Sequence, residues 1–369
     1  MKQRFTLLSL MAALLVMATT AGTLFAQDAK TAVPRYEVRT PHLRADVATP
    51  ATPLTTWDGS FEYNGTTYKY NMVGTNPTTG TSTTIKVFLI PIALKITSGG
   101  KTTTFTPETK QSVGYSAVTI TQHSPIFEDM QWTSPKGTNL GKTQYEDAFQ
   151  RGNFWSTVQN EPNYHVLLTV PTVAPVQTLT VPEADGTIAD DFGITVGNVD
   201  INWIDAQFQT IIAKYPEITP GTFPIFITYN TYLTDDGCCI GGYHSSEGSF
   251  AAPQAYAHFT YISTPGIFAQ DVSALSHETG EYIDDPLVVN TNGNPVECGI
   301  LEVGDPEEGF NEDGATYGAF PYVLSGFTFH LQDLVYLEYF GAPNTTSVDG
   351  GTESFHDNPF GLGICNNGG

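Results

Sequence analysis

A short stretch around residue 277 combines a histidine with glutamates at the spacing of a metal-binding helix. In ALSHETGEYIDDP, residues 274–286, His277 and Glu281 are four apart and project from one helix face. Glu278 stands about 100° round the same helix. H-E-x-x-H sites use this arrangement: two ligands one turn apart and a carboxylate that takes a proton from water. The variant with Glu281 predicts a site for one divalent metal, zinc foremost, with Glu278 as the general base.

A zinc site needs a third ligand, and acidic residues follow the helix at useful distances. Glu302 and Asp305 in LEVGDP are both predicted at the metal, Glu302 as third ligand and Asp305 as hydrogen-bond partner of the histidine. The reverse assignment remains open. Asp284, the next residue on the helix stripe, and His330 are weaker candidates.

His244 is a second catalytic candidate beside Glu278. It follows two glycines in GCCIGGYHSS, residues 237–246, which we expect to be a loop. Three roles remain open for it: stabilising a substrate oxyanion, completing the metal shell, or a purely structural one.

The carboxylate in place of the second histidine also changes the expected chemistry. One imidazole and two carboxylates cancel the charge of Zn²⁺, which weakens it as a Lewis acid and suits manganese, iron or calcium relatively better. The prediction is therefore a metal-dependent hydrolase, and the alternative is a non-catalytic secreted binding protein with a degenerate metal site.

The N-terminus and the composition indicate an exported protein. Lys2 and Arg4 precede an apolar run and small residues ending at Ala26, the pattern of a signal peptide over residues 1–26. We expect a secreted or periplasmic location, with no membrane association after signal cleavage. A net charge of −23 argues against nucleic acid and anionic membranes as partners.

Four cysteines in an exported chain predict two disulfides. Cys238 and Cys239 are neighbours, and a bond between neighbours is strained. We therefore expect each to pair with one of the distant cysteines, Cys298 or Cys365.

The remaining pattern predicts an α+β fold in two regions that follow a leader or linker over residues 27–56. Residues 57–197 are β-rich, with an Asn-Gly hairpin at 60–74 and one helix at 143–155. Residues 198–369 are expected to hold the metal site. The order there is a helix at 203–216, a strand at 223–230, the loop with His244, a strand at 255–264 and the His277 helix. A further helix is expected at 331–340.

This order, with the H-E-x-x-E helix, resembles the core of the zincin metallopeptidases. Residues 225–310 are similar to secreted exordium-like (phosphate-induced) proteins, whose pattern has H-E-x-x-E, a pair ending in proline and then E-[IV]-x-D. Here these are His277 to Glu281, Asp285-Pro286, and Glu302-Val303-Gly304-Asp305, with Cys238 to His244 as an upstream C-x-x-x-G-Y-H. Pro306 departs from the Leu-Cys pair of that family. The resemblance implies a zincin-like metal-site scaffold, a zinc metallopeptidase activity and, with it, a protein or peptide substrate.

Overall fold

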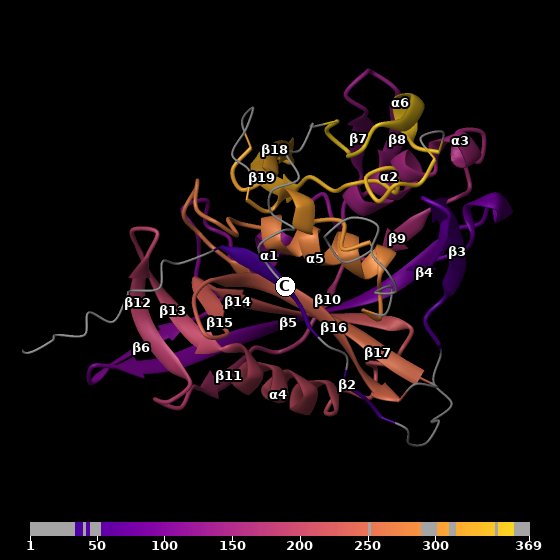
Figure 1. The fold of residues 1–369 in the computed structure, drawn as a ribbon. Coiled ribbons are helices and arrows are strands. Elements are labelled where there is room, and N and C mark those ends of the chain that lie inside the picture. Colours follow the sequence, from indigo (N-terminus) through magenta and orange to yellow (C-terminus); the bar gives the residue numbers. More distant parts are fainter. Residues whose placement is uncertain are drawn as a thin grey trace, which may run out of the picture. The chain divides into compact units, whose positions relative to one another are not determined.

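The computed structural model describes residues 34–39, 42–44, 53–249, 252–288, 301–309, 315–343 and 346–357. These residues form an α+β fold dominated by one large sheet (Figure 1). Its main path runs in the order β10 (Thr172–Val173), β5 (Thr83–Ser98), β14 (Thr222–Tyr229), β17 (Ala252–Tyr261), β16 (Ile240–Ser249), β15 (Thr231–Thr234), β13 (Ile194–Asp200) and β12 (Gly186–Asp191).

The strands of this sheet run in mixed directions. β5, β14 and β17 are parallel neighbours, whereas β16 is antiparallel to β17. Since β5 comes from the β-rich region and β14 from the following one, the sheet crosses the expected boundary at residue 198. Along β5 lie β6 (Lys101–Phe105), β9 (Val166–Leu168) and β11 (Gln177–Thr180).

Three hairpins and four short helices complete the described parts. The hairpins join β3 (Thr56–Tyr63) to β4 (Thr66–Val73), β7 (Met130–Thr133) to β8 (Asn139–Thr143), and β18 (Ala319–Leu324) to β19 (Phe327–Gln332). The short helices are α1 (Ala117–Gln122), α2 (Tyr145–Asn153), α3 (Trp155–Val158) and α6 (Val348–Gly351). No helix in the described ranges is both long and apolar enough to span a bilayer.

The central strands bury both faces, and alternate residues enter separate cores. In β14, Phe223 and Ile225 belong to one buried cluster, and Phe226 belongs to the other. Helix α4 (Ile201–Ile212) covers the second cluster, and helix α5 (Ser273–Asp284) lies on the opposite face of the sheet (Figure 1). The sheet therefore separates an α4 side from an α5 side.

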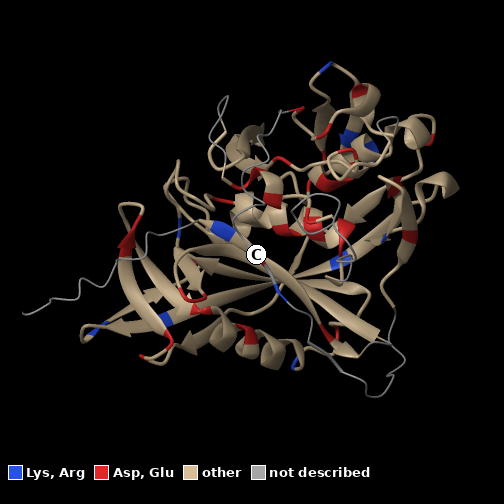
Figure 2. Cartoon of the chain, in the orientation of Figure 1, with Lys and Arg blue, Asp and Glu red and all other residues tan. Residues whose placement is uncertain are grey.

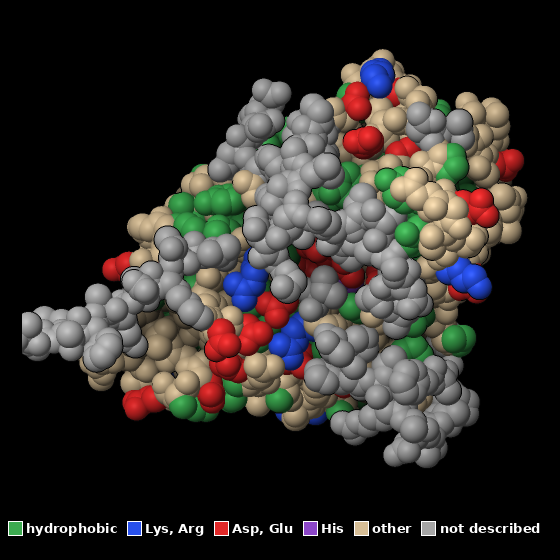
Figure 3. Space-filling model, in the orientation of Figure 1, with side chains coloured by type: hydrophobic (Ala, Val, Ile, Leu, Met, Phe, Trp, Pro, Cys, Tyr) green, Lys and Arg blue, Asp and Glu red, His purple; other side chains and the backbone are tan. Residues whose placement is uncertain are grey.

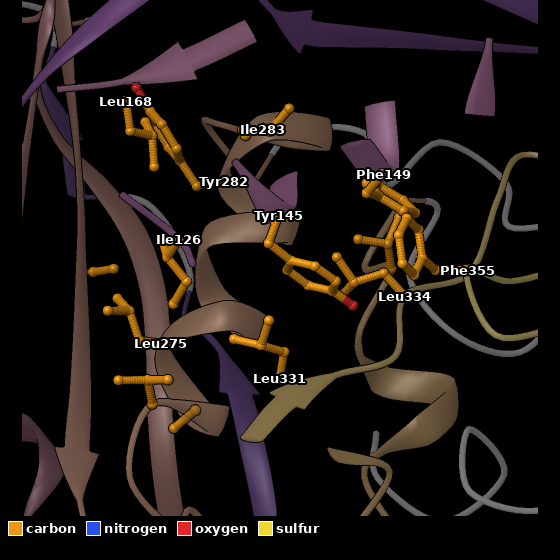
Figure 4. Close-up of a cluster of buried hydrophobic side chains, with 14 of the residues drawn as sticks. Ile126, Tyr145, Phe149, Leu168, Leu275, Tyr282, Ile283, Leu331, Leu334 and Phe355 are labelled. Carbon is orange, nitrogen blue, oxygen red and sulfur yellow. The ribbon is translucent and has the colours of Figure 1, made fainter. Parts of the chain in front are cut away.

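Helix α5 is enclosed on all sides by other parts of the protein. All its residues are buried. Its apolar side chains pack among residues of α2, β9 and β19 (Figure 4), including Leu275, Tyr282, Tyr145, Leu168 and Leu331. Tyr282 also stacks on Phe223 of β14, with ring centroids 3.6 Å apart. A helix so enclosed must place its polar side chains in the interior of the protein.

Several expected elements are present. The Asn64-Gly65 turn joins β3 to β4, as the hairpin prediction requires, with both residues at positive φ. The helices predicted at 143–155 and 203–216 correspond to α2 with α3 and to α4. The predicted strands correspond to β14 and β17, and the His277 helix to α5.

Two local predictions are wrong. The segment expected to be a loop around His244 is largely strand β16, which the paired glycines had obscured in the sequence pattern. The helix expected at 331–340 is the end of β19 followed by turns. The apolar side chains of this run are buried although the run is not helical. A short apolar run fits a helix or an extended segment equally well, so the sequence pattern could not decide between them.

The distant pairing expected for two of the cysteines is also wrong. The structure joins Cys238 to Cys239 in a disulfide across a cis peptide bond, with the Cα atoms 3.1 Å apart. The two neighbouring cysteines thus pair with each other and not with a distant cysteine. Cys298 and Cys365, and the predicted signal peptide at residues 1–26, lie outside the described residues.

Candidate metal site

Helix α5 carries three ionisable side chains into the interior on the face toward β16. His277 and Glu278 are 0% exposed and Glu281 is 1% exposed. Acidic residues gather along this part of the chain (Figure 2). Buried charges are costly unless they are paired or bind a metal, so this cluster requires a compensating partner.

Glu281 lies between two imidazoles and approaches each with a different oxygen. Its Oε1 is 3.0 Å from Nε2 of His277, and its Oε2 is 3.4 Å from Nδ1 of His244. His244 comes from β16, and the same Nδ1 is 3.5 Å from Glu278 Oε2. The strand therefore places its histidine directly over the helix stripe that the sequence pattern singled out.

The segment after α5 brings two more carboxylates to the cluster. Glu302 Oε2 lies 3.9 Å from Nε2 of His244, and Asp305 Oδ1 lies 3.5 Å from Nε2 of His277. Asp305 thus approaches the same ring nitrogen as Glu281. A supporting hydrogen-bond partner of a metal-binding histidine would instead hold the other nitrogen, Nδ1.

Within this cluster, two sets of three side chains have ligand atoms close enough to share one cation. The first set is His277, Glu278 and Glu281, and the second is His244, Glu281 and Glu302; within each set the atoms lie within 4.8 Å of one another. Glu281 belongs to both. Buried histidine and glutamate side chains of this protein could therefore hold a metal ion.

The hydrogen-bond geometry fits ligand atoms better than an internal salt-bridge network. Among the residues that the structure describes, neither ring nitrogen of His277 has an aligned hydrogen-bond partner, nor does either carboxylate oxygen of Glu278. The same holds for Nδ1 of His244 and Oε2 of Glu302. Native proteins rarely leave so many buried polar atoms unsatisfied. Close approach without alignment is expected when lone pairs point at a common ion, and imidazole and carboxylate are accepted zinc ligands.

Burial and mutual charge shift the acid–base properties of the helix residues. Burial raises the pKa of Glu278 to about 7, although His244 and His277 act to lower it. Burial also disfavours the Glu281 anion, but the two neighbouring imidazoles outweigh it and lower the pKa to about 2. Glu281 is therefore the permanent anion of the cluster, and Glu278 is a carboxyl that exchanges its proton near neutral pH.

The other members of the cluster bind protons more tightly than usual. Burial, followed by the charge of Glu281, raises the pKa of Asp305 to about 6 and that of Glu302 well above its ordinary value. For His277 and His244, burial acts to lower the pKa, but the surrounding carboxylates raise it well above the ordinary value. A divalent cation would replace these protons as the balancing positive charge.

Two glycines let the backbone approach the functional side chains. A side chain at Gly304 would meet the imidazole of His277, and one at Gly242 would meet the Glu278 carboxyl and the His258 carbonyl. The Gly304 N–H also donates to Glu281 Oε1 over 3.3 Å. At these two glycines the backbone lies directly against the His277 ring and the Glu278 and Glu281 carboxyls.

Two further ligand candidates lie elsewhere. Asp284 accepts a hydrogen bond from the Gln150 side chain of α2. His330 bonds Asp271 just before α5, with Nδ1 2.6 Å from the carboxylate. The structure therefore gathers His244, His277, Glu278, Glu281, Glu302 and Asp305, and places Asp284 and His330 against other partners.

Sequence reasoning missed two residues at the cluster. The Tyr36 ring lies against the His277 ring, with centroids 4.0 Å apart. The backbone N–H of Tyr36 donates to Glu308 Oε2 over 2.7 Å. Tyr36 belongs to the segment expected to be a leader. Its four-residue strand is too short for a periodic signal, and the contact joins distant parts of the chain.

Comparison with known proteins adds no assignment. No family of known proteins, no characterised protein and no solved structure matches this chain. The function must therefore be argued from the site itself.

Proposed function

We propose that this protein is a secreted metal-dependent hydrolase, a zinc metallopeptidase with a zincin-like site. The observation that carries the proposal is the placing of His277, Glu278 and Glu281 together on a buried helix, with His244 of β16 facing them. The apolar pattern of residues 1–26 supports export.

The proposed ligands are His277, Glu281 and one or both of Glu302 and Asp305. A bound divalent metal would supply Lewis-acid chemistry, polarising the scissile carbonyl and lowering the pKa of a water molecule. Imidazole with carboxylates suits zinc, and the number of carboxylates also suits manganese. His244 would hold Glu281 and Glu278 in place from the opposite side.

Glu278 is proposed as the group that moves protons. It would accept a proton from the attacking water and deliver it to the leaving amine. A pKa of about 7, raised by burial, suits a base that must gain and lose a proton at neutral pH. Gly242 allows this carboxyl to lie directly beneath β16.

One observation favours a second function. The whole cluster is buried, with only Asp305 partly exposed at 25% of its side chain. A closed site of this kind suits a non-catalytic secreted binding protein in which the metal is structural.

Metal analysis and peptide digestion separate the two functions. Wild type and Glu278→Gln are purified, and bound metal is measured by plasma mass spectrometry. Cleavage of a peptide library is then followed with and without chelator. The hydrolase proposal expects one metal in both proteins and chelator-sensitive cleavage only in wild type. Metal in both proteins without any cleavage, also when Tyr36 and Arg39 are both replaced by alanine, supports the binding-protein function. Equal cleavage by both proteins removes the proposed base.

A further inference from the structure

The N-terminal segment of the described chain forms two strands on the edge of β16. β1 (Arg35–Val38) and β2 (His42–Arg44) run parallel to β16. Residues 34–39 and 42–44 are called the N-terminal strap here. Val38 pairs with His244, one of the two histidines of the cluster. Further along, β2 pairs with residues 247–249. The strap thus follows β16 past the metal cluster.

The strap covers an edge that has no other partner among the described strands. β17 pairs with one edge of β16 from Gly242 to Ser249, and β15 pairs only at Ile240. Of the described strands, only β1 and β2 bond the opposite edge from Tyr243 onward. An exposed strand edge of this kind binds extended peptides through main-chain hydrogen bonds.

The strap is held on both faces of the sheet. On the α5 side, Tyr36 is 5% exposed and packs on His277 and Phe268. On the α4 side, Arg39 Nη2 donates to the Asn202 side chain over 3.1 Å and lies 3.9 Å from the Asp205 carboxylate. Residues 36 and 39 differ in parity, so alternation along the strap places them on opposite faces.

The basic anchors of the strap suit an acidic protein. Arg35 and Arg39 both belong to the strap, whereas the whole chain has a net charge of −23. Lys and Arg side chains lie among acidic ones on the face shown in Figure 3. The contact of Arg39 with the nearly buried Asp205 holds the end of β1.

We propose that the N-terminal strap is an internal inhibitor. It occupies the edge of β16 on which an extended peptide would bind, and its displacement opens the His277 cluster. The inference rests on the proposed function, since a peptide substrate must reach Glu278. It accounts for the burial of that cluster on one side, because the Tyr36 ring lies against the His277 ring where β1 pairs with β16.

The covalent connection makes the strap a strong competitor. A tethered segment acts at an effective concentration on the order of millimolar, which a dilute free peptide cannot match. Weakening the anchors should therefore expose the edge without any change to the metal-binding side chains. Tyr36 and Arg39 are the two anchors whose side-chain contacts the structure defines best.

The test uses the full chain with Tyr36→Ala and Arg39→Ala combined. The matched control is Tyr215→Ala, which removes a tyrosine that packs on the α4 side of the sheet. Hydrogen exchange is measured for the backbone amides of residues 243–249. A labelled synthetic peptide of residues 34–44, with a scrambled version as control, is titrated by fluorescence anisotropy. Cleavage of the peptide library is followed in parallel.

The double variant should exchange these amides at least about tenfold faster and bind the peptide at least about tenfold more tightly than wild type or Tyr215→Ala. Cleavage should rise by a similar factor. Exchange and binding equal to wild type in a folded double variant would overturn the strap. If the double variant does not fold, Arg39→Gln alone should give the same changes at about threefold, and no change there would equally overturn it.

The two proposals fail in different ways. Faster exchange and tighter peptide binding with no cleavage in any protein would mean that the strap covers the edge of β16 but that the protein is not a hydrolase. Cleavage that is equal in wild type and double variant keeps the hydrolase and removes the strap.

Discussion

Two histidines on neighbouring strands of the same sheet have opposite surroundings. His244 of β16 and His258 of β17 are each 0% exposed, and the register pairs Tyr243 with His258, one residue away from His244. His244 faces α5 and three glutamates. His258 faces α4, where Nε2 bonds the Thr228 hydroxyl at 3.0 Å and the ring stacks on Phe208.

The two sides of the sheet therefore treat the same side chain differently. Burial lowers the pKa of His258 to about 3, so this ring is neutral. For His244 the same burial is outweighed by Glu302, Glu278 and Glu281, and the pKa is raised well above its ordinary value. Burial alone does not make a candidate site: the convergence of carboxylates from α5 and the following segment does.

The largest expected effect is on bound metal: variants on the α5 side should lose it, and a variant on the α4 side should keep it. His277→Ala and Glu281→Ala should each abolish stoichiometric metal, because each removes a ligand atom from the cluster. His258→Gln, on the other side, should keep it. Plasma mass spectrometry of the purified variants measures this directly. A wild-type protein that stays metal-free after dialysis against zinc, manganese and calcium in turn would contradict the metal site altogether.

The sequence predicted the α5 side of this site because its signal is local. His277, Glu278 and Glu281 lie within one helix, where spacing determines direction. The position of Glu302 and Asp305 followed only from the need for another ligand. The expectation that Asp305 supports His277 from outside did not anticipate that it would approach Nε2, the nitrogen facing Glu281.

The β16 side could not be predicted in the same way. Gly241 and Gly242 interrupt the β pattern that would have identified a strand, although Gly242 is needed where β16 meets Glu278. The position of Tyr36 on His277 depends on the pairing of β1 with β16, which lies far along the sequence, and a four-residue strand carries no signal for that pairing. Strand partners are set by packing and register, which composition alone does not encode.

A glycine on the site side gives the next largest effect. Gly304→Ala would bring a methyl group against the His277 imidazole and displace it. Metal affinity should fall about 10- to 100-fold, the range for loss of a ligand's supporting contact. The matched control is Gly280→Ala in α5, whose methyl group would meet Leu334 instead. Competition with a metallochromic indicator measures both. Equal losses in the two variants would mean that general packing, rather than the position of His277, controls binding.

Proton competition should give a smaller effect, again confined to the α5 side. Glu278 has a pKa raised by burial to about 7 and Asp305 one raised to about 6, so both carboxyls are protonated at pH 5. A cation that binds Asp305 must displace its proton. This displacement should lower metal affinity about tenfold between pH 6 and pH 5, since one proton displaced costs a factor of ten per pH unit below its pKa. Titration calorimetry in two buffers of different ionisation enthalpy measures the protons released; no release at pH 6 would contradict the assignment.

The last prediction concerns the α4 side, where the stability of the protein should depend on pH through His258. The pKa of His258 is lowered by burial from 6.5 to about 3, so between these values the unfolded chain binds a proton that the folded chain does not. The stability due to the neutral ring is complete above pH 6.5 and is lost as the pH falls toward 3, by about 1.4 kcal/mol per pH unit. His258→Gln should remove this part of the slope, whereas Thr228→Val, which takes away the hydrogen-bond partner but keeps the imidazole, should retain it. Urea unfolding at pH 4, 5 and 6 gives the free energy of unfolding for each protein. If the slopes of wild type and His258→Gln agree, His258 is protonated in the folded protein, and the contrast between the two sides of the sheet fails.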